Sequence, residues 1–241
     1  MPSPGAPDVS LVVPAYNEAH RLEASFLALR EYLGGVEWSH EVVLVVERSA
    51  DGTLDLAKRL AEGQAAFRVL GNEDQRGKGH AVRCGMLAAH GAVRFFMDAD
   101  LSTPLAEIGK FLEAFRTQPA TDILIGNRQH VMSRIVRRQG WLRERMGQTF
   151  NVILRRITDL PFPDTQCGFK AFRERVVEPL FTAQTVEGFA FDVELLLIAR
   201  RRGYVVEDLP VEWRNAEGSK VHMVRDSWRM LRDALKLTRR G

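Results

Sequence analysis

The chain alternates short apolar runs with longer segments of helical periodicity, and this alternation restricts its fold more than any other feature. The runs are rich in Val, Leu and Phe and lack the polar alternation of a strand with one wet face. They suit strands covered by helices on both sides, which is typical of a mostly parallel sheet in an α/β, Rossmann-like fold. The expected strands are VSLVVP (9–14), EVVLVV (41–46), FRVL (67–70), VRFFMD (93–98) and DILIG (122–126), and the expected helices span 18–33, 53–62, 79–90 and 104–116.

Length and composition place this sheet in a single large domain. The chain has 241 residues, 45% of them hydrophobic, and can bury a sizeable core. We expect a flexible N-terminal tail at 1–8, one domain at 9–218 and a basic amphipathic helix at 219–241. The net charge of +3 is mildly basic, which fits an anionic ligand or a membrane surface, and no nucleic-acid partner is expected.

Cysteine usage and the N-terminal residues bear on the cellular setting. Cys84 and Cys167 are far apart and form no Cys-x-x-Cys pair, so neither a disulfide framework nor a zinc site is expected. The first residues, MPSPGAPD, lack the basic and apolar parts of a signal peptide, and no apolar run approaches the roughly 20 residues that cross a bilayer. We therefore expect a cytoplasmic protein, soluble or peripheral at the inner face of the membrane.

Polar, turn-rich sequences follow four of the expected strands. Because ligands of open α/β sheets bind beyond the carboxyl ends of the strands, these loops should form one site. Their residue types indicate a phosphorylated, nucleotide-bearing ligand. The four sequences are PAYNEAHR, ERSADGT, NEDQRGKGH and DADLST.

Asp98 and Asp100 end an apolar strand one residue apart. Two like charges in this position repel each other unless a cation lies beside them, and hard divalent ions prefer carboxylate and phosphate oxygens. We therefore expect Mg²⁺ or Mn²⁺ to bridge these carboxylates to a diphosphate. The simpler interpretation is a solvated turn in which Asp100 caps the next helix. Thr103 and Pro104 predict that this helix begins directly after the aspartates, with Thr as N-cap and Pro in the first turn.

Several longer motifs resemble the family 2 glycosyltransferases of the GT-A fold. Within that family they are most similar to the dolichyl-phosphate β-glucosyltransferases and to the polyprenyl-phosphate sugar transferases of bacteria and archaea. The resemblance runs from about Ser10 to about Leu235, and DTQCGFK followed by FDVELL favours the glucosyl branch. The motifs are VVPAYNEAHRL (12–22), SADGT (49–53), RGKGHAVRCGM (76–86), DADLSTP (98–104), GNR (126–128), DTQCGFKAF (164–172), FAFDVELL (189–196) and EGSKV (217–221).

The resemblance implies a nucleotide-sugar donor and assigns residues to it. Arg76 and Lys78 belong to a loop near the base and the phosphates, and the glycines at 77 and 79 would let its backbone approach a phosphate closely. The carboxylates Asp98 and Asp100 correspond to the family's metal ligands, and Asp98 also contacts the donor. The nucleotide pocket is assigned to Pro14, Tyr16 and Glu18.

One loop departs from the family pattern of two acids followed by Gly and Ser. This chain has Val46 and Glu47 in place of the acids and Arg48 in place of the glycine. Because the loop usually grips the base and the ribose, the departure leaves the donor open between UDP-glucose and GDP-mannose. Glu47 is expected to accept a hydrogen bond from a base N–H, whereas Arg48 contacts phosphate or faces solvent.

The acceptor decides the remaining assignments. A polyprenyl phosphate is already anionic and needs cationic ligands, and the resemblance implies Arg128 and Arg143, with Arg138 next. A hydroxyl acceptor would need a carboxylate base, and Asp192 stands where related enzymes carry one. Asp164 and Cys167 are interpreted as structural.

The C-terminal segment predicts an amphipathic helix with Trp228, Leu231 and Leu235 among arginines and lysines. Such a helix suits an anionic membrane surface, and it equally suits packing on the sheet with its charges in water.

The sequence leads to one function and three alternatives. The leading hypothesis is an inverting, metal-dependent glycosyltransferase that moves a hexose, glucose from UDP-glucose, to a polyprenyl or dolichyl phosphate. The alternatives are a GDP-mannose donor, a soluble hydroxyl acceptor with Asp192 as base, and a nucleotide-binding protein without catalytic activity.

Overall fold

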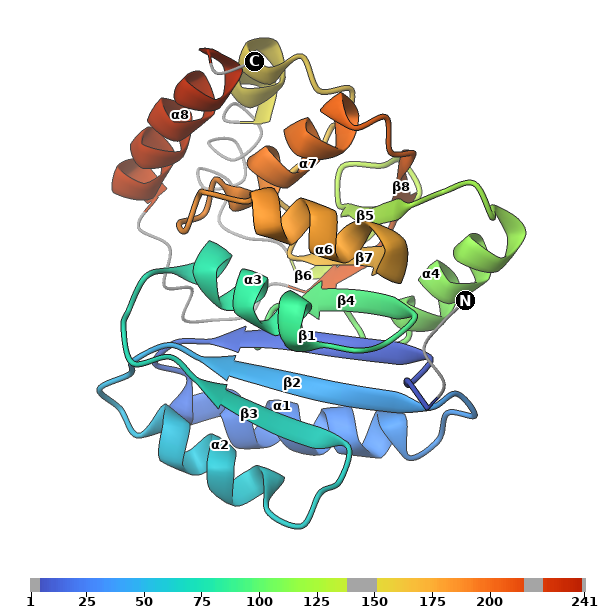
Figure 1. Cartoon of the computed structure of the whole chain (residues 1–241), viewed down its shortest axis with the longest axis vertical. Helices are drawn as coiled ribbons and strands as arrows, with labels where there is room; N and C mark the ends of the chain where they lie inside the picture. The colour runs from blue at the N-terminus through green and yellow to red at the C-terminus, as the bar shows by residue number, and fades with distance from the viewer. Residues whose placement is uncertain (1–4, 138–150, 215–222, 240–241) are drawn as a thin grey trace.

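A seven-stranded sheet runs through the centre of the protein, as the computed structural model of residues 5–137, 151–214 and 223–239 shows (Figure 1). The strand order is β3-β2-β1-β4-β7-β5-β8, and β7 alone among these strands runs antiparallel to its neighbours. Two short strands, β6 and β9, form a separate parallel pair. The strands are β1 (Val9–Ala15), β2 (His40–Val46), β3 (Phe67–Gly71), β4 (Val93–Met97), β5 (Ile123–Asn127), β6 (Arg134–Arg137), β7 (Phe169–Arg173), β8 (Val206–Pro210) and β9 (Glu212–Arg214).

Helices cover both faces of this sheet, so alternate strand residues enter two separate cores. Leu11 and Val13 of β1 pack with α1, α2 and α4, whereas Val12 packs with α3, α6 and α7 on the opposite face (Figure 1). This two-sided burial explains why the strand sequences are continuously apolar. The helices are α1 (Ala19–Leu33), α2 (Thr53–Ala61), α3 (Lys78–Ala88), α4 (Glu107–Thr117), α6 (Glu174–Ala183), α7 (Phe191–Arg201) and α8 (Met223–Arg239), and residues 151–158 are also helical.

The mostly parallel α/β sheet is therefore confirmed, and the expected strands and helices are found with small shifts of their ends. The start of α4 was predicted incorrectly, because the helix begins at Glu107 rather than at Pro104. The Ser102 carbonyl accepts a hydrogen bond from the Arg214 N–H (2.7 Å), and the Pro104 carbonyl accepts one from the Glu107 N–H (3.0 Å). These bonds hold the Thr103–Pro104 segment in a turn beside β9, and the helix follows that turn.

The antiparallel strand β7 brings the DTQCGFK motif to the end of β4. Phe169 pairs with Met97, so Gly168 lies next to Asp98. A Cβ atom added at Gly168 would stand 2.0 Å from the Asp98 Oδ2 atom, which leaves room for glycine only. The strand insertion thus fixes the side chain of the first aspartate against the backbone of the motif.

The last described helix, α8, packs on α7 through one face (Figure 1). Its Ala234 and Leu237 side chains are buried in the core that contains α3, α6 and α7. Within the described ranges, every helix is too short or too polar to span a bilayer. At the other end of the chain, residues 1–4 of the expected tail lie outside the described residues, and the Asp8 carboxylate accepts a hydrogen bond from the Ser39 hydroxyl (2.7 Å).

Candidate active site

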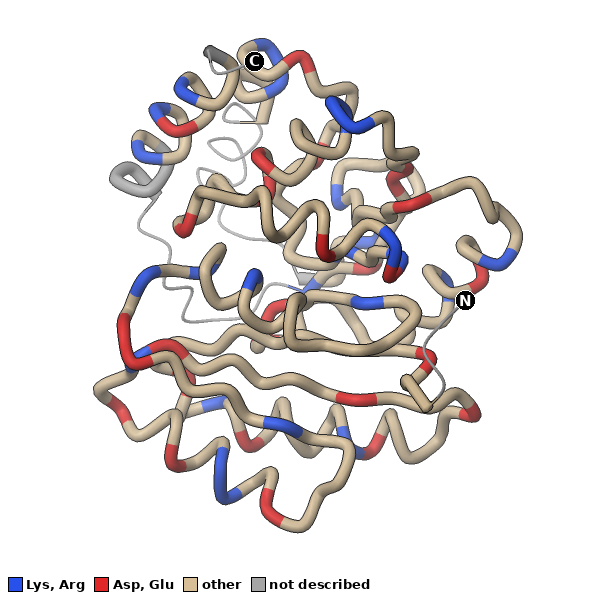
Figure 2. The backbone as a smooth tube through the Cα atoms, in the orientation of Figure 1, with Lys and Arg blue, Asp and Glu red and all other residues tan. Residues whose placement is uncertain are grey.

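A cavity of about 490 Å³ lies at the carboxyl ends of β1, β2 and β4. Figure 2 shows that charged residues of both signs occupy the loops at this end of the sheet. All of the residues that the sequence assigned to the donor and the metal line this one cavity. They are Pro14, Tyr16, Glu18, Glu47, Arg76, Lys78, Asp98 and Asp100.

The loops after β1 and β2 are joined by hydrogen bonds and form one wall. Asn17 donates its backbone N–H to the Ser49 hydroxyl (3.0 Å), and its side-chain oxygen accepts from the Ala50 N–H (2.9 Å). Glu18 donates its N–H to the Thr53 hydroxyl (2.9 Å). Asn17 has a φ of 52°, a left-handed conformation that asparagine tolerates better than most residues. The PAYNE and SADGT motifs therefore act as one folded unit that positions Tyr16 and Glu18.

Glu47 braces the loop that follows β3. Its side chain is buried, and its carboxylate accepts hydrogen bonds from Asn72 Nδ2 (2.7 Å), His80 Nδ1 (3.0 Å), and the backbone N–H groups of Arg76 (2.6 Å) and Gly77 (3.1 Å). Burial by itself would raise the pKa of Glu47, but these hydrogen bonds outweigh it and the pKa is lowered. A carboxylate has about four acceptor positions, and the protein itself provides partners for them. The expected contact with a nucleobase stays a prediction.

The two glycines of the RGKG loop pack closely against the segment before α7, and the expected approach of their backbone to a phosphate stays a prediction. A Cβ atom at Gly77 would lie 2.6 Å from the Glu187 carbonyl oxygen, and one at Gly79 would lie 2.7 Å from the Phe191 Cβ atom. Gly77 also has a φ of +126°, a conformation that favours glycine. A larger residue at either position would therefore clash with the segment before α7 or with its first residue. The ion pair between Arg76 and Glu187 joins the same two segments.

Asp98, Asp100 and Lys78 form a cluster of opposite charges in the cavity. The Lys78 ammonium nitrogen lies 2.6 Å from Asp98 Oδ1, and Asp100 Oδ1 accepts the Ser102 N–H at 2.9 Å. The pKa of the Asp100 carboxyl is raised, mainly by burial and to a smaller extent by repulsion from Asp98. Burial would lower the pKa of Lys78, but the carboxylates of Asp98, Asp192 and Asp100 together outweigh it and the pKa is raised. The carboxylate of Asp100 is therefore the less compensated of the two.

These two carboxylates fit a divalent ion that also binds a substrate phosphate. No group of three or more His, Cys, Asp or Glu residues suited to a metal occurs in the described residues. Mg²⁺ commonly takes only one or two carboxylates from a protein and completes its octahedron with phosphate oxygens and water. Asp98 and Asp100 supply such a partial set of ligands beside a cavity large enough for a diphosphate.

The DTQCGFK motif is anchored to the carboxyl end of β5 through Asp164 and Cys167. Asp164 is fully buried and accepts hydrogen bonds from Arg128 Nε (2.7 Å), Arg128 Nη2 (2.9 Å) and the Arg128 backbone N–H (3.0 Å). Burial would raise the pKa of Asp164, but the charge and hydrogen bonds of Arg128 lower it. The Cys167 sulfur packs beneath Gly126, where a Cβ atom would lie 2.8 Å from it. Asp164 and Cys167 thus have the structural roles that their sequence context suggested.

The residues assigned to the acceptor are placed differently from those of the donor. Arg128 is held by Asp164 next to the Trp213 ring, 5.7 Å from its centroid, and is not among the described residues that line the cavity. Arg143 and Arg138 lie outside the described residues. Their assignment to the acceptor phosphate therefore remains a prediction.

Asp192 belongs to a buried ion pair. Its Oδ1 atom accepts a hydrogen bond from the Lys170 ammonium (2.6 Å), which also donates to the Cys167 carbonyl (2.6 Å). Burial raises the pKa of Asp192 and Lys170 partly offsets the effect. In the described part of the chain, Asp192 is not one of the cavity residues.

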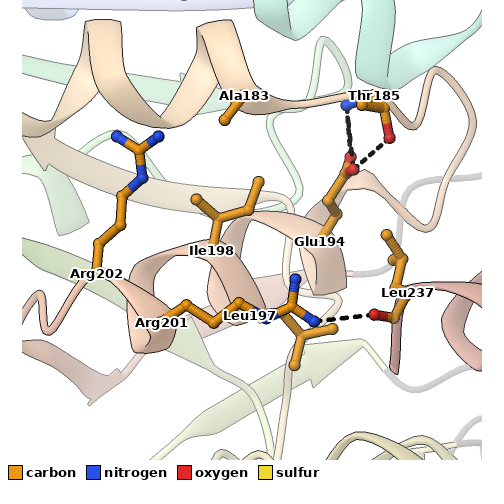
Figure 3. Close-up of a pocket in the computed structure, with 8 residues that line it drawn as sticks. All are labelled: Ala183, Thr185, Glu194, Leu197, Ile198, Arg201, Arg202 and Leu237. Atoms are coloured by element: carbon orange, nitrogen blue, oxygen red, sulfur yellow. Dashed lines mark hydrogen bonds between the residues drawn. The ribbon is translucent and has the colours of Figure 1, made fainter. Parts of the chain in front are cut away.

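Glu194 has a positioning role that the sequence reading missed. It is 3% exposed, and its carboxylate accepts hydrogen bonds from the Thr185 N–H (3.0 Å), the Thr185 hydroxyl (2.6 Å) and the Val186 N–H (2.7 Å). Figure 3 shows this carboxylate turned toward Thr185 at the edge of a second cavity of about 310 Å³. Glu194 thereby fixes the segment that contacts Gly77 and Gly79. The one sequence signal for this role is that Glu194 lies two residues after Asp192 in the FDVELL motif.

The C-terminal helix also reaches the main cavity, where Arg229, Met230 and Asp233 line it. The amphipathic pattern predicted the helix but carried no information about the surface on which it packs. This contact could be found only from the structure.

The chain was compared with known proteins. Residues 10–181 match the family described as Glycosyl transferase family 2. The dolichyl-phosphate beta-glucosyltransferase of Drosophila melanogaster is 34% identical to this chain, and the match covers 89% of this chain and 69% of the Drosophila protein. The dolichyl-phosphate beta-glucosyltransferase of Saccharomyces cerevisiae is 30% identical, and the match covers 93% of this chain and 72% of the yeast protein. The fold is similar to that of glucosyl-3-phosphoglycerate synthase of Mycobacterium tuberculosis, solved in complex with Mn²⁺, uridine diphosphate and glucosyl-3-phosphoglycerate. The TM-score is 0.68 at 19% sequence identity, and the superposition covers 96% of this chain and 80% of the synthase chain.

The match to the family extends over more than half of the chain, and the structural similarity confirms the GT-A fold. Three of the motifs within this match, VVPAYNEAHRL, RGKGHAVRCGM and DADLSTP, contribute residues that line the main cavity. The chain therefore belongs to glycosyl transferase family 2 and is a glycosyltransferase.

Proposed function

We propose that this enzyme transfers glucose from UDP-glucose to a polyprenyl phosphate of the dolichyl type, with inversion at the anomeric carbon. The observation that carries the proposal is the similarity to two dolichyl-phosphate beta-glucosyltransferases across 89% and 93% of this chain. The cavity supports it, because it combines a pair of carboxylates with Arg76 and Lys78 in a space suited to a nucleoside diphosphate sugar.

The donor half of the mechanism rests on charge. Asp98 and Asp100 would hold Mg²⁺ or Mn²⁺, which supplies positive charge to the leaving diphosphate when it is bound. Arg76 and Lys78 line the same cavity and add fixed positive charge where negative charge develops. Tyr16 and Glu18 border the part of the cavity formed by the joined loops after β1 and β2, and we assign the nucleoside to that part.

The acceptor half needs no general base. A lipid phosphate is ionised at neutral pH and attacks without losing a proton, so positioning and charge are sufficient. Asp192 fits this chemistry, since its carboxylate is bonded to Lys170 and buried. We assign the acceptor phosphate to Arg128 and Arg143, with Arg128 oriented by the two side-chain hydrogen bonds to Asp164.

A soluble hydroxyl acceptor is the second candidate. The specific observation in its favour is the fold similarity to an enzyme crystallised with glucosyl-3-phosphoglycerate. That chemistry would require Asp192 to leave Lys170 and accept a proton from the hydroxyl group.

Ligand-dependent melting tests the donor. We expect UDP and UDP-glucose with Mn²⁺ to raise the melting temperature more than GDP and GDP-mannose, because a ligand that binds only the native state stabilises it by mass action. The measurement is a thermal melt with each nucleotide, with Mn²⁺, Mg²⁺ or a chelator. A larger shift with GDP-mannose would move the proposal to mannosyl transfer, and no shift with any nucleotide would favour the protein without catalytic activity.

We also propose that α8 contacts an anionic membrane surface. Trp228 is 69% exposed and Leu235 is 39% exposed, and Arg232 and Lys236 are exposed on the same helix. Figure 2 shows basic segments along α8. A helix with exposed apolar side chains among basic ones can lie at the interface and bring the cavity to a lipid-linked acceptor.

Vesicle binding tests this contact. The Trp228→Ala variant should bind vesicles that contain anionic phosphatidylserine about tenfold more weakly, because it loses the largest exposed apolar side chain of the helix. Co-sedimentation at low and at high salt measures the effect. Leu27→Ala, which also removes an exposed apolar side chain (43% exposed) but from α1, serves as the control. Equal binding by both variants would contradict the proposal.

A further inference from the structure

Lys78 occupies an electrostatically unusual position. It is the first residue of α3, and the first turn of this helix contains no acidic residue. The N-terminus of a helix carries a partial positive charge, so an ammonium group there is disfavoured unless an anion compensates it. The compensation comes from Asp98, whose Oδ1 atom lies 2.6 Å from the Lys78 nitrogen.

One side of the Asp98 carboxylate is packed against the backbone. The carboxylate lies directly above Gly168, where even a Cβ atom would stand 2.0 Å from its Oδ2 atom. Lys78 has a long side chain with four rotatable bonds, and both partners line the cavity, with 20% of the Lys78 side chain and 38% of the Asp98 side chain exposed. The same carboxylate is one of the two that we assign to the divalent ion, so the ammonium and the ion compete for it.

We propose that Lys78 is the counter-ion of Asp98 in the donor-free enzyme and exchanges this carboxylate for the donor diphosphate when the divalent ion binds. The inference rests on the proposed donor site and deepens it. Before exchange, Lys78 neutralises Asp98 and disfavours the ion. After exchange, Lys78 faces the diphosphate together with Arg76, and Asp98 is available as a ligand.

The exchange makes the ion and the nucleotide bind cooperatively. The ion binds Asp98 and thereby frees Lys78 for the diphosphate, and the diphosphate binds Lys78 and thereby frees Asp98 for the ion. The ion should therefore increase the affinity for the nucleotide, and the nucleotide should increase the affinity for the ion by the same factor. A nucleotide-free enzyme should then bind the ion weakly, which protects the cavity from a metal bound without donor.

Direct binding of Mn²⁺ tests the proposal without measuring transfer. Titration calorimetry and the electron paramagnetic resonance of free Mn²⁺ give its affinity with and without UDP. The Lys78→Met variant should bind Mn²⁺ about tenfold more tightly than the wild type in the absence of UDP, because the competing ammonium is gone. The factor by which UDP tightens Mn²⁺ binding should shrink accordingly.

Two further variants keep the test specific. Lys78→Arg retains the positive charge and should keep nucleotide-free Mn²⁺ binding weak. Lys110→Met removes an ammonium at the same distance, 2.6 Å, from the carboxylate of Glu107 outside the cavity, and should leave Mn²⁺ binding unchanged.

The outcomes separate this inference from the proposed function. If the wild type binds UDP and Mn²⁺ together but Lys78→Met shows no tighter nucleotide-free binding, the exchange is overturned and the donor site stands. If neither the wild type nor Lys78→Met binds Mn²⁺ with or without UDP, both the exchange and the metal-dependent function are overturned.

Discussion

The Asp100→Asn variant is expected to lose at least about a hundredfold in the rate of glucose transfer, because it removes one of the two carboxylates that would hold the divalent ion. Asparagine has the same shape, and its side-chain oxygen can keep the hydrogen bond from the Ser102 N–H. The loss of rate would therefore report the missing charge rather than a disturbed loop. Steady-state transfer with saturating UDP-glucose and Mn²⁺ measures it.

The stability of the same variant should change in the opposite direction. The pKa of Asp100 is raised in the folded protein by burial and by Asp98, so its ionised form opposes folding. This unfavourable contribution appears as the pH rises above the carboxyl's unfolded pKa and is absent at lower pH. Asp100→Asn should accordingly melt at the same temperature as the wild type or higher at neutral pH. Asp55→Asn, an exposed position of α2, is the matched control for both measurements.

A variant with wild-type transfer rates would remove Asp100 from the metal site. A variant that is slow and also melts at a much lower temperature would indicate a folding defect, and the lower rate would then not support a role of Asp100 in the metal site.

Lys170→Met should lower the free energy of unfolding by about 3–5 kcal/mol, the cost of leaving one buried charge without its partner. Lys170 has no exposed surface and donates hydrogen bonds to Asp192 and to the Cys167 carbonyl, each at 2.6 Å. Methionine fills a similar volume, so the main loss is the ammonium beside the Asp192 carboxylate. Urea unfolding at neutral pH measures the difference.

The double variant Lys170→Met/Asp192→Leu separates the charge from the packing. It removes both members of the pair and should recover most of the lost stability, because replacing a buried ion pair by apolar residues is often close to neutral. Arg116→Met provides a surface control, since Arg116 and its partner Glu113 are 73% and 57% exposed and a surface pair contributes about 1 kcal/mol or less. A loss below about 1 kcal/mol for Lys170→Met would contradict the buried-charge account.

The apolar runs were sufficient to predict the parallel part of the sheet. Strands β1, β2, β4 and β5 are buried on both faces, and continuous Val, Leu and Phe residues are the direct consequence. The carboxyl ends of parallel strands meet at one edge, which is why residues as distant in sequence as Pro14 and Asp100 were correctly assigned to one cavity.

Contacts between distant segments were less accessible to the sequence. The insertion of β7 between β4 and β5 depends on long-range pairing, so the sequence did not reveal that Gly168 adjoins Asp98. Glu47 and Glu194 are buried carboxylates that hold loops, and their residue type alone does not distinguish a loop brace from a ligand contact. The same limit applies to Thr103 and Pro104, whose local helix signal was overridden by a hydrogen bond to β9.

The central claim is transfer of glucose from UDP-glucose to a lipid phosphate. It is tested most directly by following radioactive glucose from the donor to its acceptor. The purified protein is incubated with Mn²⁺, UDP-[¹⁴C]glucose and both dolichyl phosphate in detergent and 3-phosphoglycerate in water, and the two phases are separated. We expect the label to enter the organic phase as a lipid-linked sugar, and a chelator to prevent this. Label found only on 3-phosphoglycerate, or on neither acceptor, would contradict the account.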